Sequence, residues 1–157
     1  MFTLNKCLVH SCKNLSLSVF DETNGMTEKR GYCLNHTPDP GRTKEAIYDY
    51  IKKHDVIVGL NTAGIMFRDI DLSNKRFYGC NFQYCTFSDL RSEGLRAKLC
   101  MFDFATFGDC TLAGSTMQFT SFACCTFSHT IFTGSDMVQN NRSEEHTSEL
   151  QSRSAIS

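Results

Sequence analysis

Large apolar side chains recur at every fifth position through residues of about 65 to 139, and this period dominates the sequence. Small residues lie two positions before most of them, with short polar residues between the two series. A period of five fits neither the 3.6-residue repeat of an α-helix nor the 2-residue repeat of a simple strand. A short internal repeat instead indicates a solenoid, in which each unit buries its apolar face against its neighbours. The large positions run Phe67, Leu72, Phe77, Phe82, Phe87, then Phe102, Phe107, Leu112, Met117, Phe122, Phe127, Phe132 and Met137.

The same positions also repeat on a longer period of 20 residues. Two phenylalanines followed by two other residues recur at this spacing, so that stacking places phenylalanine on phenylalanine. Four pentapeptides therefore form one coil, and we predict an all-β solenoid with four sides and a filled interior. The structural core predicted from this register is Phe77, Phe82, Phe87, Phe102, Phe107, Leu112, Met117, Phe122, Phe127 and Phe132.

Two positions of the apolar series hold small residues, Ser92 and Ala97. Each follows a leucine two positions earlier, Leu90 and Leu95, so the large and small residues have exchanged places. This exchange conserves volume in a close-packed core. The alternative is a loop over residues 91–98 that breaks the register. We favour the exchange because the phenylalanines resume in phase after it.

The repeats resemble the pentapeptide-repeat family, whose pattern is a small residue, Asp or Asn, Leu or Phe, and two free positions. The segments that carry the resemblance are Cys80-Asn81-Phe82, Cys85-Thr86-Phe87, Cys125-Thr126-Phe127 and Ser135-Asp136-Met137. The resemblance covers about half of the chain. It implies a right-handed, quadrilateral β-helix. With coils about 4.8 Å apart, the repeats would form a rod roughly 15–20 Å long.

The N-terminal residues 1–37 form a separate head with the spacing Cys-x4-Cys, 20 residues, then Cys-x2-His. Between the two halves, Asn24-Gly25 predicts a tight type I′ turn, and the hairpin would bring the halves together. Three thiolates and an imidazole suit tetrahedral Zn²⁺, and a metal cross-link would explain how so short a segment folds. The head resembles zinc-knuckle modules, although four residues rather than two separate its first cysteines. The predicted structural zinc ligands are Cys7, Cys12, Cys33 and His36, with His10 as an alternative ligand; reduced, unliganded cysteines in a flexible head are the other interpretation.

Five cysteines occupy the small inward position of the repeats, namely Cys80, Cys85, Cys100, Cys110 and Cys125. A metal or redox site is one interpretation, because Cys80 and Cys100 would lie one above the other. We favour small buried side chains, since cysteine packs like a small hydrophobe and no histidine shares the series. Cys124 is expected to face outward.

Residues 38–64 are predicted to connect the head to the repeats. Residues 37–41 are expected to be a linker, and Thr43 to cap a helix over about residues 44–54. Because solenoids need covered ends, we expect this helix and residues 56–58 to cap the N-terminal end rather than to bind a partner.

Residues 140–157 lack the five-residue period and are expected to be disordered. Residues 142–157 resemble the in-frame translation of a common sequencing-library adapter. On this interpretation the natural chain differs after about Asn141, and C-terminal coils or a dimerising element would be missing from this sequence.

Charge and composition restrict the function classes. The formal net charge is −1, and neither a secretory signal nor a membrane-spanning apolar run is visible, so a cytoplasmic protein is expected. We expect a non-enzymatic protein-binding or scaffold module with a protein partner, and neither membrane nor direct nucleic-acid binding. The repeats contain one histidine, His129, and no visible base–nucleophile pair. The alternative is a DNA-mimicking regulator of a type II topoisomerase, as some pentapeptide-repeat proteins are. Seven acidic and six basic residues over 65–139 give too little negative charge to favour it.

Overall fold

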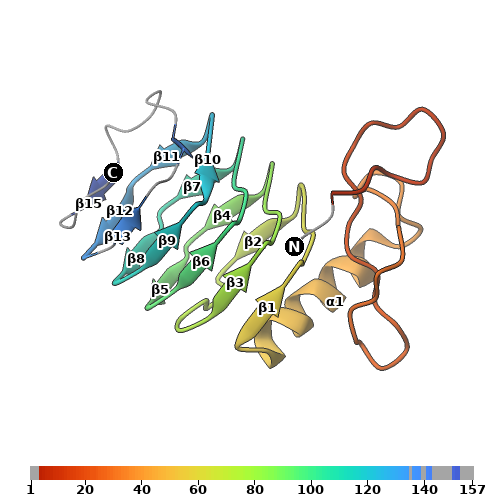
Figure 1. The fold of residues 1–157 in the computed structure, drawn as a ribbon, viewed down its shortest axis with the longest axis horizontal. Helices are drawn as coiled ribbons and strands as arrows, with labels where there is room; N and C mark the ends of the chain where they lie inside the picture. Colours follow the sequence, from red (N-terminus) through yellow and green to blue (C-terminus); the bar gives the residue numbers. More distant parts are fainter. Residues whose placement is uncertain (1–3, 135, 139–140, 143–149, 153–157) are drawn as a thin grey trace.

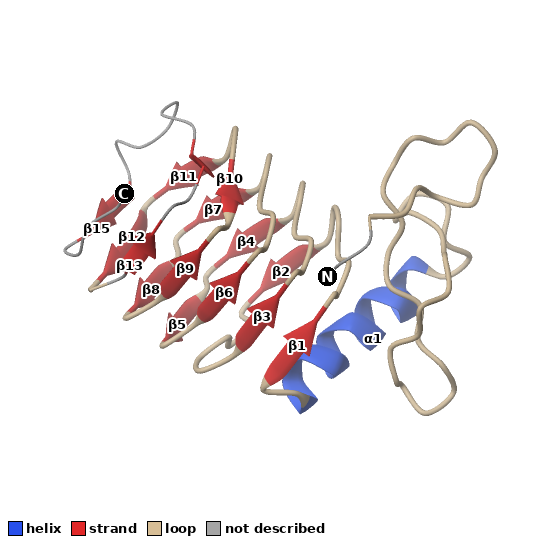
Figure 2. Ribbon diagram, in the orientation of Figure 1, coloured by secondary structure: helices blue, strands red, loops and turns tan. Residues whose placement is uncertain are grey.

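The computed structural model describes residues 4–134, 136–138, 141–142 and 150–152. One helix, α1 (Pro40–Lys53), precedes a column of short parallel strands (Figures 1 and 2). Among the described residues, no helix has the length and apolar character needed to cross a lipid bilayer. The strands are β1 (Val56–Val58), β2 (Met66–Arg68), β3 (Arg76–Tyr78), β4 (Thr86–Ser88), β5 (Arg91–Glu93), β6 (Arg96–Lys98), β7 (Thr106–Gly108), β8 (Thr111–Ala113), β9 (Thr116–Gln118), β10 (Ser121–Phe122), β11 (Thr126–Ser128), β12 (Thr130–Thr133), β13 (Asp136–Val138), β14 (Asn141–Arg142) and β15 (Leu150–Ser152).

The strands form four parallel sheets, which are the four sides of the solenoid. We call them the β1 face (β1-β3-β6-β9-β13), the β2 face (β2-β4-β7-β11), the β5 face (β5-β8-β12-β15) and the β10 face (β10-β14). Single bridges between Asn61, Asn81, Met101 and Ser121 continue the β10 face toward the helix. The paired strands are offset by 20 residues, as in Phe87↔Phe107. This register confirms the prediction of four pentapeptides per coil.

The interior is filled by stacked phenylalanine rings. Phe82, Phe102 and Phe122 stack with ring centroids 5.0 and 5.1 Å apart. A second column runs through Phe87, Phe107 and Phe127 at 4.9 and 5.1 Å. All ten side chains named for the core from the sequence are at most 5% exposed. Offset stacking at these separations adds to the stabilisation from burial alone.

The exchange of large and small residues also occurs as expected. Leu90 and Leu95 are buried, and Ser92 and Ala97 lie in strands β5 and β6. The Ser92 hydroxyl accepts a hydrogen bond from the Leu72 amide at 2.8 Å, so the small polar side chain is satisfied inside the wall. The loop interpretation of residues 91–98 is therefore wrong.

The helix begins four residues before the predicted start at about residue 44. Asp39, rather than Thr43, is the N-cap residue, and its carboxylate accepts a hydrogen bond from the Arg42 amide at 3.1 Å. Pro40 then occupies the first helical position, where its missing N–H has no helical partner to lose. The predicted linker thus contributes its last two residues to α1.

Helix α1 covers the N-terminal end of the solenoid. Ile47 and Ile51 are buried in the core, and Tyr48 stacks on Phe67 with centroids 5.4 Å apart. The Tyr48 hydroxyl donates to the Met66 carbonyl at 2.9 Å and accepts from the Arg68 amide at 3.0 Å. Because β2 is the edge strand of its sheet, this side chain satisfies backbone groups that would otherwise be open to pairing.

The solenoid itself starts before residue 65. Strand β1 pairs with β3 through Ile57↔Phe77, which places Ile57 in phase with the core series. Residues 56–58 are therefore the first rung of the β1 face as well as part of the cap. At the other end, the structure places β14 against β10 and β15 against β12. These two strands depart from the expected disorder of residues 140–157; the remaining residues of that range lie outside the described part.

Candidate metal centre

The first half of the candidate site is a short loop that carries Cys7 and Cys12. The Cys7 amide donates to the Asn14 carbonyl at 2.8 Å, and the Cys12 amide donates to the Val9 carbonyl at 3.1 Å. Ser11 adopts a left-handed conformation with φ 69°, which reverses the chain just before Cys12. These turns direct both sulfur atoms to the same side of the loop.

The second half is a tight turn from Cys33 to His36. The amides of His36 and Thr37 both donate to the Cys33 carbonyl, at 3.1 and 2.9 Å. The chain therefore turns back over Cys33, and the imidazole comes to lie 3.3 Å from the Cys33 sulfur, measured to Nδ1.

The connection between the two halves is a hairpin, but its turn differs from the predicted type I′. That turn needs positive φ at both central residues, and only Asn24 has it, at 63°. The Asp21 amide donates to the Gly25 carbonyl at 2.9 Å, and the Asp21 carboxylate accepts from the amides of Thr23 and Gly25. A carboxylate that satisfies two amides thus stabilises a wider loop.

The ligand atoms of Cys7, Cys12, Cys33 and His36 all lie within 4.8 Å of one another. Around tetrahedral zinc, two sulfurs are about 3.8 Å apart, and a sulfur and an imidazole nitrogen about 3.5 Å. The sulfurs of Cys12 and Cys33 are 3.9 Å apart, and Cys7 Sγ lies 3.6 Å from His36 Nδ1. The four side chains therefore fit a tetrahedral metal ion. His10 is exposed and is not a member of this group.

The thiols of the group differ in acidity. Burial raises the pKa of Cys7, but hydrogen bonds from the backbone of Cys33 and Val9 and from the His36 side chain outweigh it and lower the pKa to about 6. The backbone of Asn14 lowers the pKa of Cys12, whereas burial and the neighbouring sulfurs of Cys7 and Cys33 raise it above its usual value. The group thus favours one thiolate even before a cation is considered.

Two supporting hydrogen bonds were not predicted from the sequence. The Asn14 side-chain amide donates to Cys33 Sγ at 3.7 Å, and the Val9 amide donates to Cys7 Sγ at 3.5 Å. Such contacts orient thiolate ligands and stabilise their charge. Asn14 lies only two residues after Cys12, which is the signal that could have suggested it.

The head is attached to the first coil through Ser18. The Ser18 amide donates to the Asn61 carbonyl at 3.0 Å, and the Asn61 amide donates to Ser18 Oγ at 2.8 Å. Leu17 is buried in the same core as the solenoid. The Cys₃His group is therefore held against the capped end of the repeats.

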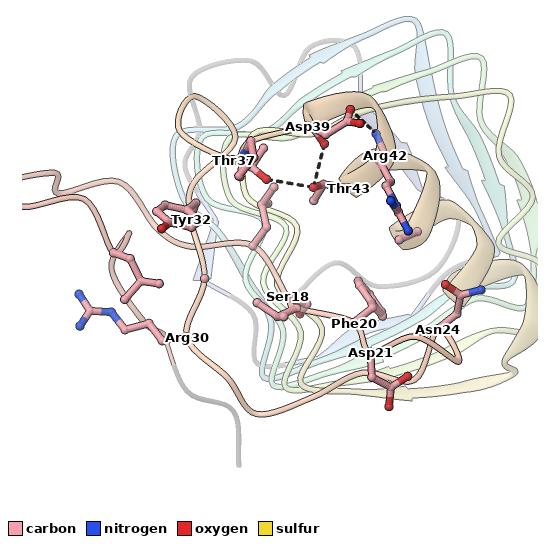
Figure 3. A pocket seen from close by; sticks show the side chains of 16 residues that line it. Ser18, Phe20, Asp21, Asn24, Arg30, Tyr32, Thr37, Asp39, Arg42 and Thr43 are labelled. Atoms are coloured by element: carbon pink, nitrogen blue, oxygen red, sulfur yellow. Dashed lines mark hydrogen bonds between the residues drawn. The ribbon is translucent and has the colours of Figure 1, made fainter.

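A groove of about 400 Å³ runs between the head and the start of helix α1 (Figure 3). Its lining includes Phe20, Tyr32 and Ala46. At its rim the hydroxyls of Thr37 and Thr43 are 3.0 Å apart, and Thr43 donates to the Asp39 carbonyl at 3.1 Å. These hydrogen bonds stabilise the first turn of helix α1. The lining of the groove contains no cysteine or histidine.

The five inward cysteines have a repeated structural role. Each thiol contacts the backbone carbonyl 23 residues earlier, from 2.8 Å for Cys125 to Phe102 up to 3.5 Å for Cys80 to Ile57. Burial raises the pKa of Cys85 and of Cys125 to about 12. Among the described residues, the head holds the one group of three or more metal-ligating side chains. The interpretation as small packed side chains is the one that these contacts support.

The fold defines a parallel β-solenoid with a filled interior, a helical cap and a Cys₃His head. Residues 100–137 match the family of pentapeptide repeats, in eight copies. This segment of the solenoid therefore consists of pentapeptide repeats.

Among solved structures, a pentapeptide repeat protein (Rfr23) from the cyanobacterium Cyanothece 51142 is similar to this chain. The two sequences are 7% identical, and the match covers 69% of this chain and 95% of that chain with a TM-score of 0.37. No curated protein matches the sequence significantly.

Proposed function

We propose that the chain is a non-enzymatic protein-binding module, in which the solenoid presents its sides to a partner and zinc stabilises the head. The observation that carries this proposal is a set of large apolar residues at the corners of the solenoid. Tyr84, Leu99, Phe104 and Phe119 are each about half exposed. All four have positive φ, between 50 and 62°.

These corner residues are doubly unfavourable in the isolated chain. A left-handed conformation costs roughly 1–2 kcal/mol for a residue with a Cβ, and glycine or asparagine would avoid most of it. An exposed apolar side chain also forfeits its burial energy. Tyr84 and Phe104 additionally stack on each other, with centroids 5.0 Å apart, which presents a flat aromatic surface. A protein partner that covers these side chains would recover the burial energy.

The zinc part of the proposal rests on the four ligand atoms and their separations. Four protein ligands leave no open position for substrate, so the ion would cross-link the two halves of the hairpin and take no part in a reaction. The interior supports a non-enzymatic role in a similar way, because the stacked rings leave no cleft there.

Site-specific crosslinking tests the binding function. Benzoylphenylalanine in place of Phe104 should give a discrete protein adduct on irradiation in cells. The same residue in place of Asp109, at a different corner of the same coil, is the matched control. Adducts of equal yield at both positions, or none at either, would contradict a protein-binding corner.

DNA mimicry is the second candidate, and one observation favours it. Asp69, Asp89 and Asp109 stack at one corner, one carboxylate per coil. However, Asp89 lies 3.5 Å from Arg68, and Asp109 lies 3.8 Å from His129, so the column is partly neutralised. A DNA gyrase supercoiling assay separates the candidates, since a mimic would inhibit at low concentration and a scaffold would not.

A further inference from the structure

The β1 face carries an excess of positive charge. Its described outward side chains include Arg76, Arg96 and Lys98 and no carboxylate; the others are Val56, Val58, Tyr78, Thr116 and Gln118. Arg76 and Arg96 are direct partners in the parallel ladder, one rung or about 4.8 Å apart. Like charges placed opposite each other in a sheet are destabilising. This arrangement therefore lowers the stability of the free chain.

Nearby carboxylates do not relieve this charge. Among the described residues, the ion pairs with carboxylates are made by Arg68, Lys75 and His129, none of which lies among the three cations. Asp55, which precedes β1, lies 3.6 Å from Lys75. Glu93 belongs to the β5 face, on the other side of the corner at Gly94. Arg76, Arg96 and Lys98 are thus open to an external anion.

A shallow hollow of about 270 Å³ lies between these side chains. Its lining comprises Tyr78, Arg96, Ala97, Lys98, Thr116 and Gln118. Guanidinium, ammonium, two hydroxyls and a carboxamide can all donate hydrogen bonds, and the lining holds no acid. This donor set suits an oxyanion such as a carboxylate.

An apolar corner borders the cationic side chains. Leu99 directly follows Lys98, and Phe119 directly follows Gln118. Both side chains are about half exposed. A ligand that covers the whole strip needs carboxylates beside apolar side chains.

We propose that the β1 face binds an acidic, leucine- or phenylalanine-containing segment of a protein partner. Its carboxylates pair with Arg76, Arg96 and Lys98, and its apolar side chains cover Leu99 and Phe119. This assignment rests on the proposed protein-binding function and names the chemistry of the partner.

The distribution of acids favours a peptide over a nucleic acid. The three cations lie on one face of a chain whose net charge is −1, whereas the adjoining β5 face carries Glu93 beside Arg91, and Asp71 lies one coil before Arg91. A long polyanion that extended over both faces would meet these carboxylates. A short peptide confined to strands β1, β3, β6 and β9 does not reach Asp71 or Glu93.

Fluorescence anisotropy with a labelled peptide of alternating glutamate and leucine tests the proposal on the full chain. Binding should weaken as salt is raised, because exposed charges are screened. The double variant Arg96→Glu/Lys98→Glu should bind at least about tenfold more weakly. It should also unfold at the same or a higher temperature, since a carboxylate at position 96 would face Arg76 in place of a like charge. Arg96→Gln/Lys98→Gln, which adds no negative charge, should lose affinity in the same direction.

The matched control is Lys29→Glu/Arg91→Glu, which changes the net charge equally at exposed positions away from the β1 face. It should retain the affinity of the unmodified chain. The proposal is overturned if the glutamate–leucine peptide does not bind, or if a glutamine–leucine peptide binds equally well. It is also overturned if both charge-reversed variants lose the same affinity, or if oligothymidylate binds more tightly than the peptide. An adduct at position 104 in cells together with no peptide binding would overturn the acidic-segment assignment and leave the protein-binding function standing.

Discussion

Replacing Phe102 by alanine tests the stacked interior most directly. The Phe102 ring is 5% exposed and stacks on Phe82 and Phe122, while Phe87 and Phe107 contact it at 5.9 and 6.0 Å. Truncating a buried phenylalanine costs about 3–5 kcal/mol, and the rigid coils above and below this one restrict collapse of the cavity. We therefore expect a loss of about 4–5 kcal/mol, a large fraction of the stability of a small domain.

Phe104→Ala is the matched control. Phe104 lies two residues away in the same coil, but its side chain is 49% exposed and points outward at the corner. Its truncation should cost less than about 1 kcal/mol, since alanine inherits the same left-handed backbone. Equilibrium urea unfolding of both variants gives the free energies, and equal m-values would show that the same surface unfolds in each. Similar losses at the two positions would refute the inward stacking.

Three further predictions follow from the head, the buried thiols and a corner. Protein purified without chelator should contain about one equivalent of Zn²⁺ by elemental analysis, and Cys33→Ser/His36→Ala should abolish it while Cys124→Ser, the exposed control, leaves it unchanged. Burial raises the pKa of Cys85 and of Cys125 to about 12, against 9.0 for an exposed thiol, so only the unfolded state loses these protons as pH rises above 9. The free energy of unfolding should therefore fall from pH 9 toward 12. It should fall more steeply than in a Cys85→Ala/Cys125→Ala variant. An identical slope in that variant would contradict the buried-thiol assignment. Phe119→Gly should raise the free energy of unfolding by about 1 kcal/mol, because glycine adopts a φ of 50° at lower cost than phenylalanine. A lower free energy of unfolding in urea would argue instead that the exposed ring packs on the chain.

The repeat register and the grouping of three cysteines with one histidine could be read from the sequence, because both depend on residue type at fixed spacing. The 20-residue period of phenylalanine at 82, 102 and 122 gives the coil length directly, and Cys33-x2-His36 forms one local turn. The start of the helix could not be read in this way. Asp39 and Thr43 are both competent N-caps, and the two prolines flanking Asp39 suggested a linker although Pro40 favours a first helical turn.

The first coil was missed for a different reason. Thr62, which lies at a central position of the repeat, is buried and polar, so it interrupts the apolar series between Ile57 and Phe67. Its hydroxyl donates to the Asn81 carbonyl at 3.0 Å, a long-range contact that no local pattern reveals. The amine of Lys75 is another such case. It reaches the carbonyls of Lys52 and His54 at 3.2 and 2.8 Å, and so holds the C-terminal end of α1 against the solenoid.

Because one coil contains four pentapeptides, the number of pentapeptides that precede a surface patch determines on which side of the solenoid the patch lies. Insertion of one whole coil between Gly79 and Leu95 would lengthen the rod by about 4.8 Å and leave each side facing its original direction. Insertion of a single pentapeptide would instead turn everything beyond it by a quarter of a revolution about the long axis. The cations at Arg96 and Lys98 would then leave the side that begins at β1 and point in a new direction relative to the head. Inserting or deleting whole coils thus changes the length of the rod, whereas inserting or deleting single pentapeptides changes which binding surfaces lie on the same side.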